Sequence, residues 1–464
     1  MASGEFSHQH TRDPAGINSD PPTTLLDLLS NTLVLYQTIP YLPVSSILKL
    51  AVTSRSFHHL LYSTPGVFRH LDLTQVKSAQ LGNGGVGYDG QASGPLRDIF
   101  SRLAKDNLLQ DVNTLVLDGL SVTAEFITEL LVSPTSRVRT LSIREVKNLD
   151  ERKLMQALRH ACRPTRPEWM PRLKALYYFG NKDAPAPPSP ASCAQSRATS
   201  PKGANIALGW NHKSQHALNK AVVHEDDDWY SCKGRVVNRR IAEGWADTMA
   251  ECRGIIRFDT VLCTGPRHPN SAAFGKAHVM PAGSEEESRW GVATFALNGC
   301  ASCGTAPEGF TVYADATAEK LPLLSPVPLH SSTIKAATCP KGARQTGNSR
   351  PQLIPRCLGC IRERYCFSCN QWWCEDCYQV PSPEELSGSP SPVQIVDETS
   401  DVSDQEGAAL EKTKVKRDPK ITRSCWECER NCLDCIAETQ KRCKSCGGGY
   451  CIIHHEGSTA TLKD

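Results

Sequence analysis

The sequence predicts a multidomain α+β protein whose three regions follow different structural patterns. Residues 24–73 carry apolar side chains at helical spacing between turn-forming prolines and glycines. Residues 114–178 contain three short stretches that alternate apolar and polar residues as strands do, with helical stretches between them. The last third of the chain holds most of the cysteines and little regular patterning. We therefore expect an amino-terminal helical module, a short α/β region and a cysteine-rich module with little regular structure.

Composition excludes several classes of protein. The chain has 464 residues, enough for two to four domains, and 39% of them are hydrophobic. The formal net charge is only +3, which disfavours bulk nucleic-acid binding because phosphate contacts need concentrated Lys and Arg. No apolar run approaches the ~20 residues of a membrane span. The polar start has no apolar signal segment, so we expect reduced cysteines and a location in the cytoplasm or nucleus.

The region 24–73 is predicted to form short helices with tight turns. The residue order LPVSSILKLAVTSRSFHHL over 42–60, followed by PGVFRHLDL over 65–73, resembles an F-box. The family usually has Trp where this chain has Phe57 and Phe68, and its opening Leu-Pro pair is replaced by Ser30-Asn31. The resemblance implies docking of a Skp1-type adaptor, which bridges to a cullin scaffold, while the rest of the chain recruits a protein substrate. The expected adaptor-binding residues are Leu42, Pro43, Ile47, Leu48, Leu50, Phe57, Leu60 and Phe68.

Strand-like stretches at 114–118, 139–144 and 173–178 alternate with helical stretches at 124–131 and 151–161. Their starts recur after about 26 and about 32 residues, so residues 96–180 resemble irregular leucine-rich repeats, which would present a curved surface to substrates. A small α/β layer packed on the helical module is the alternative.

Residues 205–320 are predicted to form a second α/β region, with a helix near 237–251 and a strand at 255–262. A strand at 290–297 leads into a metal-binding knuckle at Cys300, and residues 310–313 lead out of it as its hairpin partner.

Four segments interrupt these regions. Residues 1–22, 181–203, 321–352 and 379–423 are rich in Pro, Ser or charged residues and lack periodicity. Such segments bury too little apolar surface to offset the entropy of ordering. We expect 1–22 and 379–423 to be disordered, and 181–203 and 321–352 to be linkers.

The cysteines are arranged mainly as Cys-x-x-Cys pairs, and the last pair ends in histidine. Two residues between thiols let both sulfurs bind one tetrahedral ion, and a closed structural zinc site takes two such pairs. The eight pairs therefore predict about four structural Zn²⁺ ions. Disulfides are the less favoured alternative, because disulfide-rich domains are typically small and secreted. The predicted ligands are Cys300, Cys303, Cys357, Cys360, Cys366, Cys369, Cys374, Cys377, Cys425, Cys428, Cys432, Cys435, Cys443, Cys446, Cys451 and His454.

Pairs 357/360, 366/369 and 374/377 are echoed by pairs 432/435, 443/446 and 451/454, and the predicted zinc units are residues 353–378 and 424–456. Each set of three pairs needs a fourth, which pairs 300/303 and 425/428 could supply in either assignment. The residue after a pair often needs a positive φ, which suits Gly304, Asn370 and Gly447. The remaining cysteines are interpreted as ordinary buried residues: Cys162, Cys193, Cys232, Cys252, Cys263 and Cys339.

The favoured hypothesis is a non-catalytic substrate receptor of a Skp1-cullin-F-box ubiquitin ligase, with zinc fingers for protein binding. Interleaved zinc pairs also resemble RING, FYVE and ZZ modules, and RYCFSCNQWWCEDCY over 364–378 looks most like a ZZ finger. A directly acting RING-like ligase is thus a second hypothesis. A zinc-dependent nucleic-acid-binding regulator is a third, although no recognition helix stands out between ligand pairs.

Overall fold

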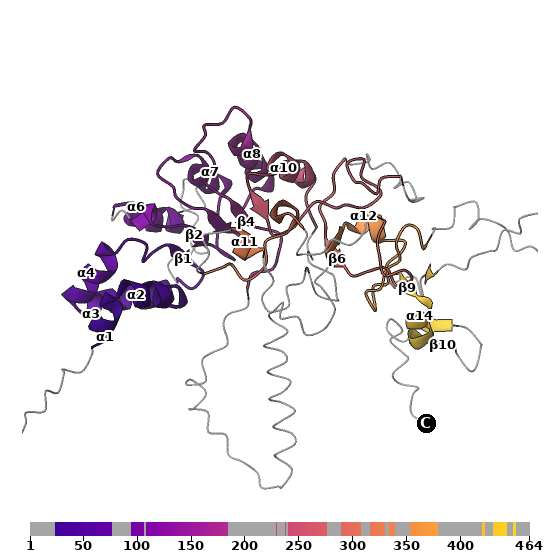
Figure 1. The fold of residues 1–464 in the computed structure, drawn as a ribbon, viewed down its shortest axis with the longest axis horizontal. Coiled ribbons are helices and arrows are strands. Elements are labelled where there is room, and N and C mark those ends of the chain that lie inside the picture. Colours follow the sequence, from indigo (N-terminus) through magenta and orange to yellow (C-terminus); the bar gives the residue numbers. More distant parts are fainter. Residues whose placement is uncertain are drawn as a thin grey trace, which may run out of the picture. The chain divides into compact units, whose positions relative to one another are not determined.

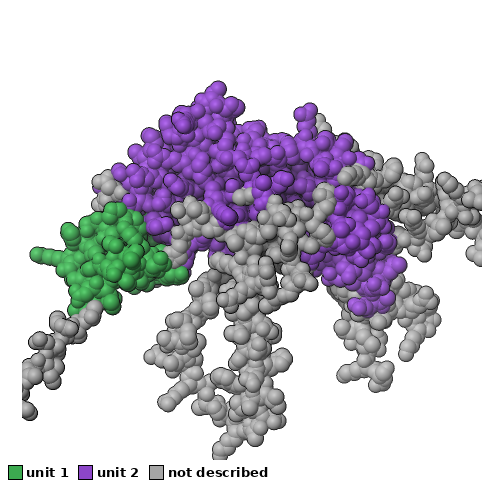
Figure 2. All heavy atoms as spheres, viewed as in Figure 1, with its two compact units in different colours: residues 1–68 green, residues 69–464 purple. Residues whose placement is uncertain are grey.

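A computed structural model describes residues 24–76, 94–105, 108–183, 229, 237, 240–275, 289–307, 316–329, 334–338, 353–378, 420–422, 430–442 and 449–451. The chain divides into two compact units, residues 1–68 and residues 69–464, coloured separately in Figure 2. Both contain helices, and the second also contains strands, so the protein belongs to the mixed α/β class.

In the described part of the chain, no helix combines the length and the apolar character that crossing a membrane would require.

The first unit is built from short helices. They are α1 (Leu25–Ser30), α2 (Thr32–Thr38), the 3-10 helix η1 (Ile39–Tyr41), α3 (Val44–Thr53) and α4 (Arg55–Ser63). The side chains of Thr24, Asn31 and Ser54 accept hydrogen bonds from backbone amides and so cap α1, α2 and α4. The core of the unit includes Leu35, Ile47 and Leu61, all fully buried.

The second unit begins with a sheet of five parallel strands in sequential order. They are β1 (His70–Asp72), β2 (Thr114–Val116), β3 (Thr140–Ser142), β4 (Ala175–Tyr177) and β5 (Arg257–Phe258). The pairing places Leu71, Leu115, Leu141, Leu176 and Phe258 level with one another across the sheet. Parallel strands that follow one another without crossing are typical of solenoid repeats, in which each repeat packs on its neighbour.

Helices alternate with these strands. They are α6 (Gly94–Lys105), the 3-10 helix η2 (Leu108–Gln110), α7 (Ala124–Val132), α8 (Glu151–Cys162) and α10 (Trp245–Glu251). The three strands and two helices predicted over 114–178 are confirmed, and β1 and β5 extend the sheet on both sides. The helix predicted near 237–251 is found as α10, which begins only at Trp245. Gly244, the residue before it, has a φ of +91°, which is outside the right-handed helical region, so the helix does not extend back through this position.

Two buried aspartates accept hydrogen bonds from backbone amides at the ends of adjacent strands. Asp118 follows β2 and accepts a hydrogen bond of 2.8 Å from the backbone N–H of Arg144. Asp259 follows Phe258, and its carboxylate accepts from the amides of Tyr178, Phe179 and Gly180 at 3.0, 3.0 and 2.7 Å. A buried carboxylate that accepts several amide hydrogens satisfies donors that no strand partner reaches. These contacts connect the ends of adjacent parallel strands.

One face of the sheet is covered by a segment that the sequence predicted as part of a linker over 321–352. In its described part, Leu321, Leu323, Leu324 and Val327 are buried. A 3-10 helix η5 (Ala318–Lys320) precedes them, and α11 (Ile334–Ala337) follows. In Figure 1, α7, α8 and α10 lie on one face of the sheet and α11 on the other. The prolines thus interrupt regular structure without preventing burial of the leucines.

The cysteine-rich region contains small two-stranded sheets. Strand β6 (Phe295–Leu297) pairs antiparallel with β7 (Ile354–Arg356), which leads into α12 (Leu358–Ile361). The predicted hairpin partner of β6, residues 310–313, lies outside the described residues. Further along, β8 (Ile421–Thr422) pairs with β9 (Asn431–Cys432), which runs into α14 (Leu433–Thr439), and β10 (Gln440–Arg442) pairs with β11 (Gly449–Cys451).

Several predicted segments fall largely outside the described residues. These are 1–22, 181–203 apart from 181–183, and 379–423 apart from 420–422. Of the two predicted zinc units, 353–378 is described throughout and 424–456 only in part.

Candidate metal centres and candidate docking surface

Three groups of four side chains in the described residues could each hold a metal ion. Within a group, all ligand atoms lie within 4.8 Å of one another, as tetrahedral coordination requires. Site 1 is Cys263, His268, Cys357 and Cys360; site 2 is Cys300, Cys303, Cys374 and Cys377; site 3 is Cys366, Cys369, Cys432 and Cys435.

Site 1 lies where the parallel sheet meets the cysteine-rich region. Cys263 follows strand β5, and Cys357 follows β7. The Sγ atoms of Cys263 and Cys360 are 3.8 Å apart, and Nε2 of His268 is 3.3 Å from Sγ of Cys357. The neighbouring glycines are required: a Cβ at Gly265 would lie 2.4 Å from Sγ of Cys360, and one at Gly291 would lie 2.4 Å from the His268 ring.

Site 2 joins the predicted knuckle at Cys300 to the end of the predicted zinc unit 353–378. Sγ of Cys303 lies 3.6 Å from Sγ of Cys374, and the amide of Cys374 donates to Sγ of Cys300 at 3.1 Å. Gly304 has a φ of +70°, as predicted for the residue after this pair. The turn is tight, because a Cβ at Gly299 would lie 2.1 Å from the carbonyl oxygen of Gly304.

Site 3 joins the two predicted zinc units, 353–378 and 424–456, which the sequence analysis treated as separate. Sγ of Cys369 is 3.9 Å from Sγ of Cys432. The side chain of Asn431 reinforces the contact, because its Oδ1 accepts from the backbone N–H of Ser368 at 3.1 Å. Asn370 adopts the left-handed conformation expected of it, with a φ of +59°. Gly447 lies outside the described residues.

The thiols shift one another's pKa values. A hydrogen bond from Thr305 lowers the pKa of Cys303 to about 6, whereas burial raises the pKa of Cys369 to about 11. At site 1 burial opposes ionisation of Cys263, but hydrogen bonds from Cys357 and Cys360 lower its pKa, whereas hydrogen bonds with Cys263 and Cys357 raise the pKa of Cys360. Neighbouring thiols therefore cannot all ionise together unless a cation balances their charge.

Two buried arginines supply positive charge near these thiols. Arg356 and Arg364 flank Glu375, with Nη2 of Arg364 2.7 Å and Nε of Arg356 3.9 Å from Oε1 of that carboxylate. Two guanidinium groups and one carboxylate leave a net charge of +1, and all three side chains are at most 4% exposed. A Cys₄ site that holds a divalent ion carries two negative charges, so this arrangement favours loaded sites.

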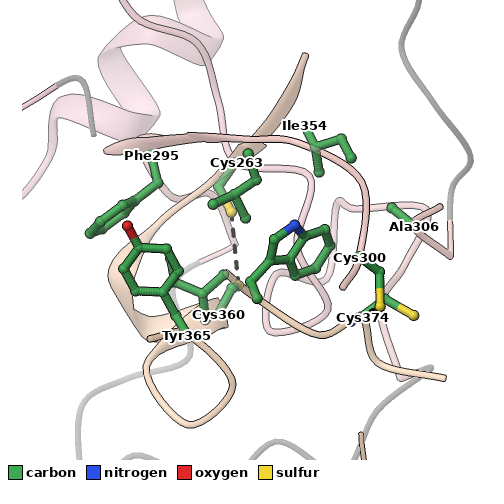
Figure 3. Packing of buried hydrophobic residues seen from close by; sticks show 11 residues of the cluster. Cys263, Phe295, Cys300, Ala306, Ile354, Cys360, Tyr365 and Cys374 are labelled. Atoms are coloured by element: carbon green, nitrogen blue, oxygen red, sulfur yellow. Dashed lines mark hydrogen bonds between the residues drawn. The ribbon is translucent and has the colours of Figure 1, made fainter. Parts of the chain in front are cut away.

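An apolar cluster lies between the sites. Figure 3 shows Cys263 facing Cys360 and Cys300 beside Cys374, with Phe295 and Tyr365 packed nearby. The rings of Phe295 and Tyr365 meet edge to face at 5.3 Å, and Trp372 is fully buried. The region therefore combines candidate metal sites with a small core of its own.

The site differs from the sequence prediction in two ways. Cys263, interpreted as an ordinary buried cysteine, is buried but also belongs to site 1, and His268 was not predicted at all. Their Cys-x4-His spacing directly after a predicted strand was the available signal. Cys425, Cys428, Cys443, Cys446 and His454 lie outside the described residues, and only the backbone of Cys451 is described, so the prediction of four ions stays a prediction.

The predicted adaptor-binding residues do not form one exposed face. Ile47 and Phe68 are buried in the core of the first unit, at 1% and 3% exposure. Leu42, Leu50, Phe57 and Leu60 are half-buried, whereas Pro43 and Leu48 are exposed. The unit nevertheless presents other large apolar side chains to solvent, namely Leu25, Leu28, Leu33, Val34, Tyr41 and Val52.

No protein-family model matches the chain, and a comparison with curated proteins finds no match either.

Proposed function

We propose that this protein is a substrate-receptor subunit of a Skp1-cullin-F-box ubiquitin ligase and performs no catalysis itself. The observation that carries the proposal is the apolar surface of the first unit. Leu33, Tyr41 and Val52 are 74%, 67% and 81% exposed there. Exposed apolar side chains of this size on a small helical unit are typical of a helix-groove interface with a partner protein. The adaptor is the partner that the resemblance of residues 42–73 implies.

The candidate metal sites are proposed to hold structural Zn²⁺. Two of them offer four cysteines and the third offers three cysteines and one histidine. These are the ligand sets of closed zinc sites, in which no coordination position remains for a reacting water. On this proposal the metal fixes the shape of the carboxyl-terminal region, which would then contribute to recognition of the protein substrate. The protein would act in the cytoplasm or the nucleus.

The adaptor interface can be tested with surface variants. We expect Leu48→Asp and Val52→Asp, alone and together, to weaken capture of a Skp1-type adaptor by the full-length chain about tenfold or more, because each places a charge on an exposed apolar face of α3. Gln37→Asp is the matched control, since it adds the same charge at an exposed polar position of α2. Ile47→Asp is unsuitable, because that side chain is in the core. Adaptor capture that is equal for all variants would refute the proposal.

A directly acting ligase is the second candidate, favoured by the order of the ligand pairs. Along the chain the pairs belong in turn to sites 1, 2, 1, 3, 2 and 3. Interleaving of this kind resembles the cross-braced zinc modules of RING ligases. On this alternative the full-length chain would be expected to ubiquitinate itself with E1, E2, ubiquitin and ATP in the absence of adaptor and cullin. No self-modification under those conditions would eliminate it.

A further inference from the structure

The face of the parallel sheet opposite the helices is occupied by the chain's own residues. This segment, residues 321–329 and 334–338, is termed the strap. Side chains alternate between the two faces of a strand, so Val116 and Tyr177 point away from the face of Leu115 and Leu176. The apolar contact is made by Leu323, Val327, Ile334 and Ala337 of the strap with Val116, Ala175 and Tyr177 of the sheet. A solenoid usually binds its partners on a surface of this kind.

Hydrogen bonds to backbone atoms of the strap join it to β5 and β4. The amide of Leu323 donates to the carbonyl oxygen of Phe258 at 2.9 Å, and the Tyr177 hydroxyl donates to the carbonyl oxygen of Leu324 at 3.1 Å. Within the strap itself, the amide of Leu324 donates to the carbonyl oxygen of Ala337 at 2.8 Å. An extended peptide from another protein could make the same contacts, because they use backbone atoms and apolar side chains.

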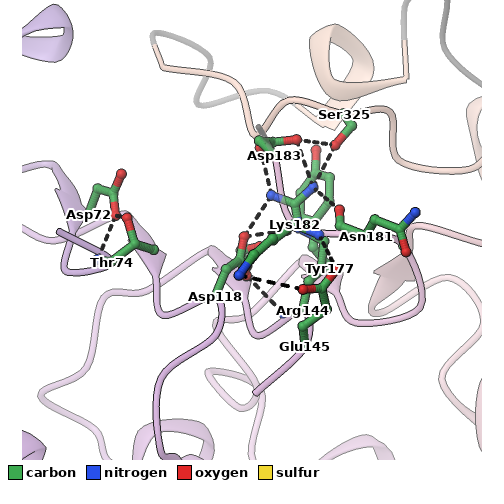
Figure 4. A network of polar contacts seen from close by, with 12 residues as sticks. Asp72, Thr74, Asp118, Arg144, Glu145, Tyr177, Asn181, Lys182, Asp183 and Ser325 are labelled. Atoms are coloured by element: carbon green, nitrogen blue, oxygen red, sulfur yellow. Dashed lines mark hydrogen bonds and ion pairs between the residues drawn. The ribbon is translucent and has the colours of Figure 1, made fainter. Parts of the chain in front are cut away.

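One contact depends on the chemistry of a strap side chain, the hydroxyl of Ser325. The Ser325 hydroxyl donates to Oδ1 of Asp183 and accepts from Nη1 of Arg144, both at 2.5 Å (Figure 4). Arg144 is 1% exposed and also pairs with Asp118, whose Oδ2 is 2.7 Å from Nη2. A group at the Ser325 position must therefore both donate and accept a hydrogen bond, which a hydroxyl does. A phosphate would bring about two negative charges beside two carboxylates and would be repelled.

We propose that the strap is an internal ligand that covers a peptide-docking face of the sheet. The partner is an extended segment of a target protein, rich in leucine and proline like residues 321–329, with an unmodified Ser or Thr at the place of Ser325. The inference depends on the proposed function in one respect, namely that this face of the sheet recruits the target protein. A target segment would displace the strap. Phosphorylation of the Ser or Thr hydroxyl of the target segment would prevent docking.

Hydrogen exchange of the unaltered protein tests whether the strap opens by itself. The reporting amides are those of Leu323 and Leu324 in the strap, compared with Leu117 and Ile143, which donate to the sheet carbonyls of Ser142 and Tyr177. We expect the strap amides to exchange at least about tenfold faster, as a locally opening segment does. Equal exchange rates would mean that the strap opens only when the sheet unfolds, and would overturn the proposal.

Peptide binding tests the face beneath the strap. The probe is a fluorescent peptide of residues 318–329 (AEKLPLLSPVPL), added to the full-length chain. Leu323→Asp in the chain should loosen the strap and tighten binding of the probe at least about tenfold. Leu433→Asp, the same change at an exposed leucine of α14, should leave probe binding unchanged.

Variants of the probe test the role of the hydroxyl. Probes with alanine or phosphoserine in place of Ser325 should bind about tenfold more weakly or worse. Equal binding of all probes, or no gain with Leu323→Asp, would overturn the proposal. None of these measurements involves the adaptor, so intact probe binding with lost adaptor capture would contradict only the ligase assignment.

Discussion

A zinc chelator added to the full-length protein is expected to unfold the cysteine-rich region while helices α1–α4 remain folded. Sites 1, 2 and 3 all lie in the second unit, and within the described residues of the first unit no comparable group occurs. A structural zinc site supplies on the order of 10 kcal/mol of apparent folding free energy at neutral pH. The small cluster around Trp372 and Tyr365 cannot replace three such contributions, because burying one large apolar side chain contributes only about 1.5–3 kcal/mol.

The loss should extend beyond the metal sites to the edge of the sheet. Site 1 connects Cys263, in the segment that follows β5, to Cys357 and Cys360 after β7. Without the ion, these neighbouring thiols repel one another as they ionise, so this segment is joined to the cysteine-rich region only by backbone hydrogen bonds such as that from Thr264 to Pro355. Protection against hydrogen exchange should therefore fall strongly over 353–378, partly over 255–263, and not over 32–63.

Metal analysis of the intact chain gives the matching count. At least three Zn²⁺ ions per chain are expected, and Cys303→Ser should remove one. The side chain of Cys303 is exposed, so this change costs little packing. Cys162→Ser, at a buried cysteine outside the three groups, is the control that should keep the full count. Unaltered protease resistance of 353–378 after complete metal removal would show that these sites are not structural.

The local part of the metal sites could be predicted from the sequence, but the pairing could not. A Cys-x-x-Cys pair is defined by the short backbone between its thiols, and the same backbone requires the positive φ seen at Gly304 and Asn370. Pairing depends on which segments the fold brings together. Cys263 meets Cys360 across 97 residues because the segment after β5 runs beside β7, where the amide of Thr264 donates to the carbonyl oxygen of Pro355, and ligand spacing contains no information on this topology.

In the sheet, too, local structure could be predicted from the sequence whereas long-range pairing could not. Alternation of apolar residues around Leu115, Leu141 and Leu176 correctly predicted three strands, because this pattern depends only on residues that are neighbours in the sequence. The strand predicted at 255–262 is found as the two-residue β5, but its pairing with β4 could not be predicted, because β4 lies far upstream. The strap lies within the segment predicted as a linker, in which Pro322 and Pro326 remove periodicity. Burial of Leu321 and Leu323 depends on a sheet face formed by distant residues.

Replacing Arg144 by methionine is expected to destabilise the second unit by about 3–5 kcal/mol, as is typical when one partner of a buried ion pair is removed. The guanidinium is 1% exposed and lies between Asp118 and Asp183, which are 4% and 35% exposed. Burial alone opposes ionisation of both carboxyls, yet the contacts with Arg144 hold the pKa of Asp183 below its usual value. Methionine fills similar space but leaves these carboxylates without a counter-charge.

The deficit of Arg144→Met should shrink as the pH falls. In the unaltered protein, the lowered pKa of Asp183 contributes stability above the pKa of the unfolded chain, and this contribution is lost as the pH falls through the folded pKa. In the variant, Asp118 keeps the burial that already raises its pKa and loses Arg144, so its folded form binds a proton more readily and gains stability on acidification. Both effects reduce the difference in free energy of unfolding between the unaltered protein and Arg144→Met.

A double variant separates lost charge pairing from lost packing. Adding Asp118→Asn to Arg144→Met removes one uncompensated carboxylate, so the double variant should be more stable than Arg144→Met alone. The measurement is hydrogen exchange at the amides of Leu117 and Ile143, whose hydrogen bonds join neighbouring strands of the sheet. If the double variant were less stable than the single one, and the deficit were independent of pH, then Arg144 would stabilise the sheet by packing its side chain on Tyr177, whose ring centroid lies 5.5 Å from the guanidinium carbon.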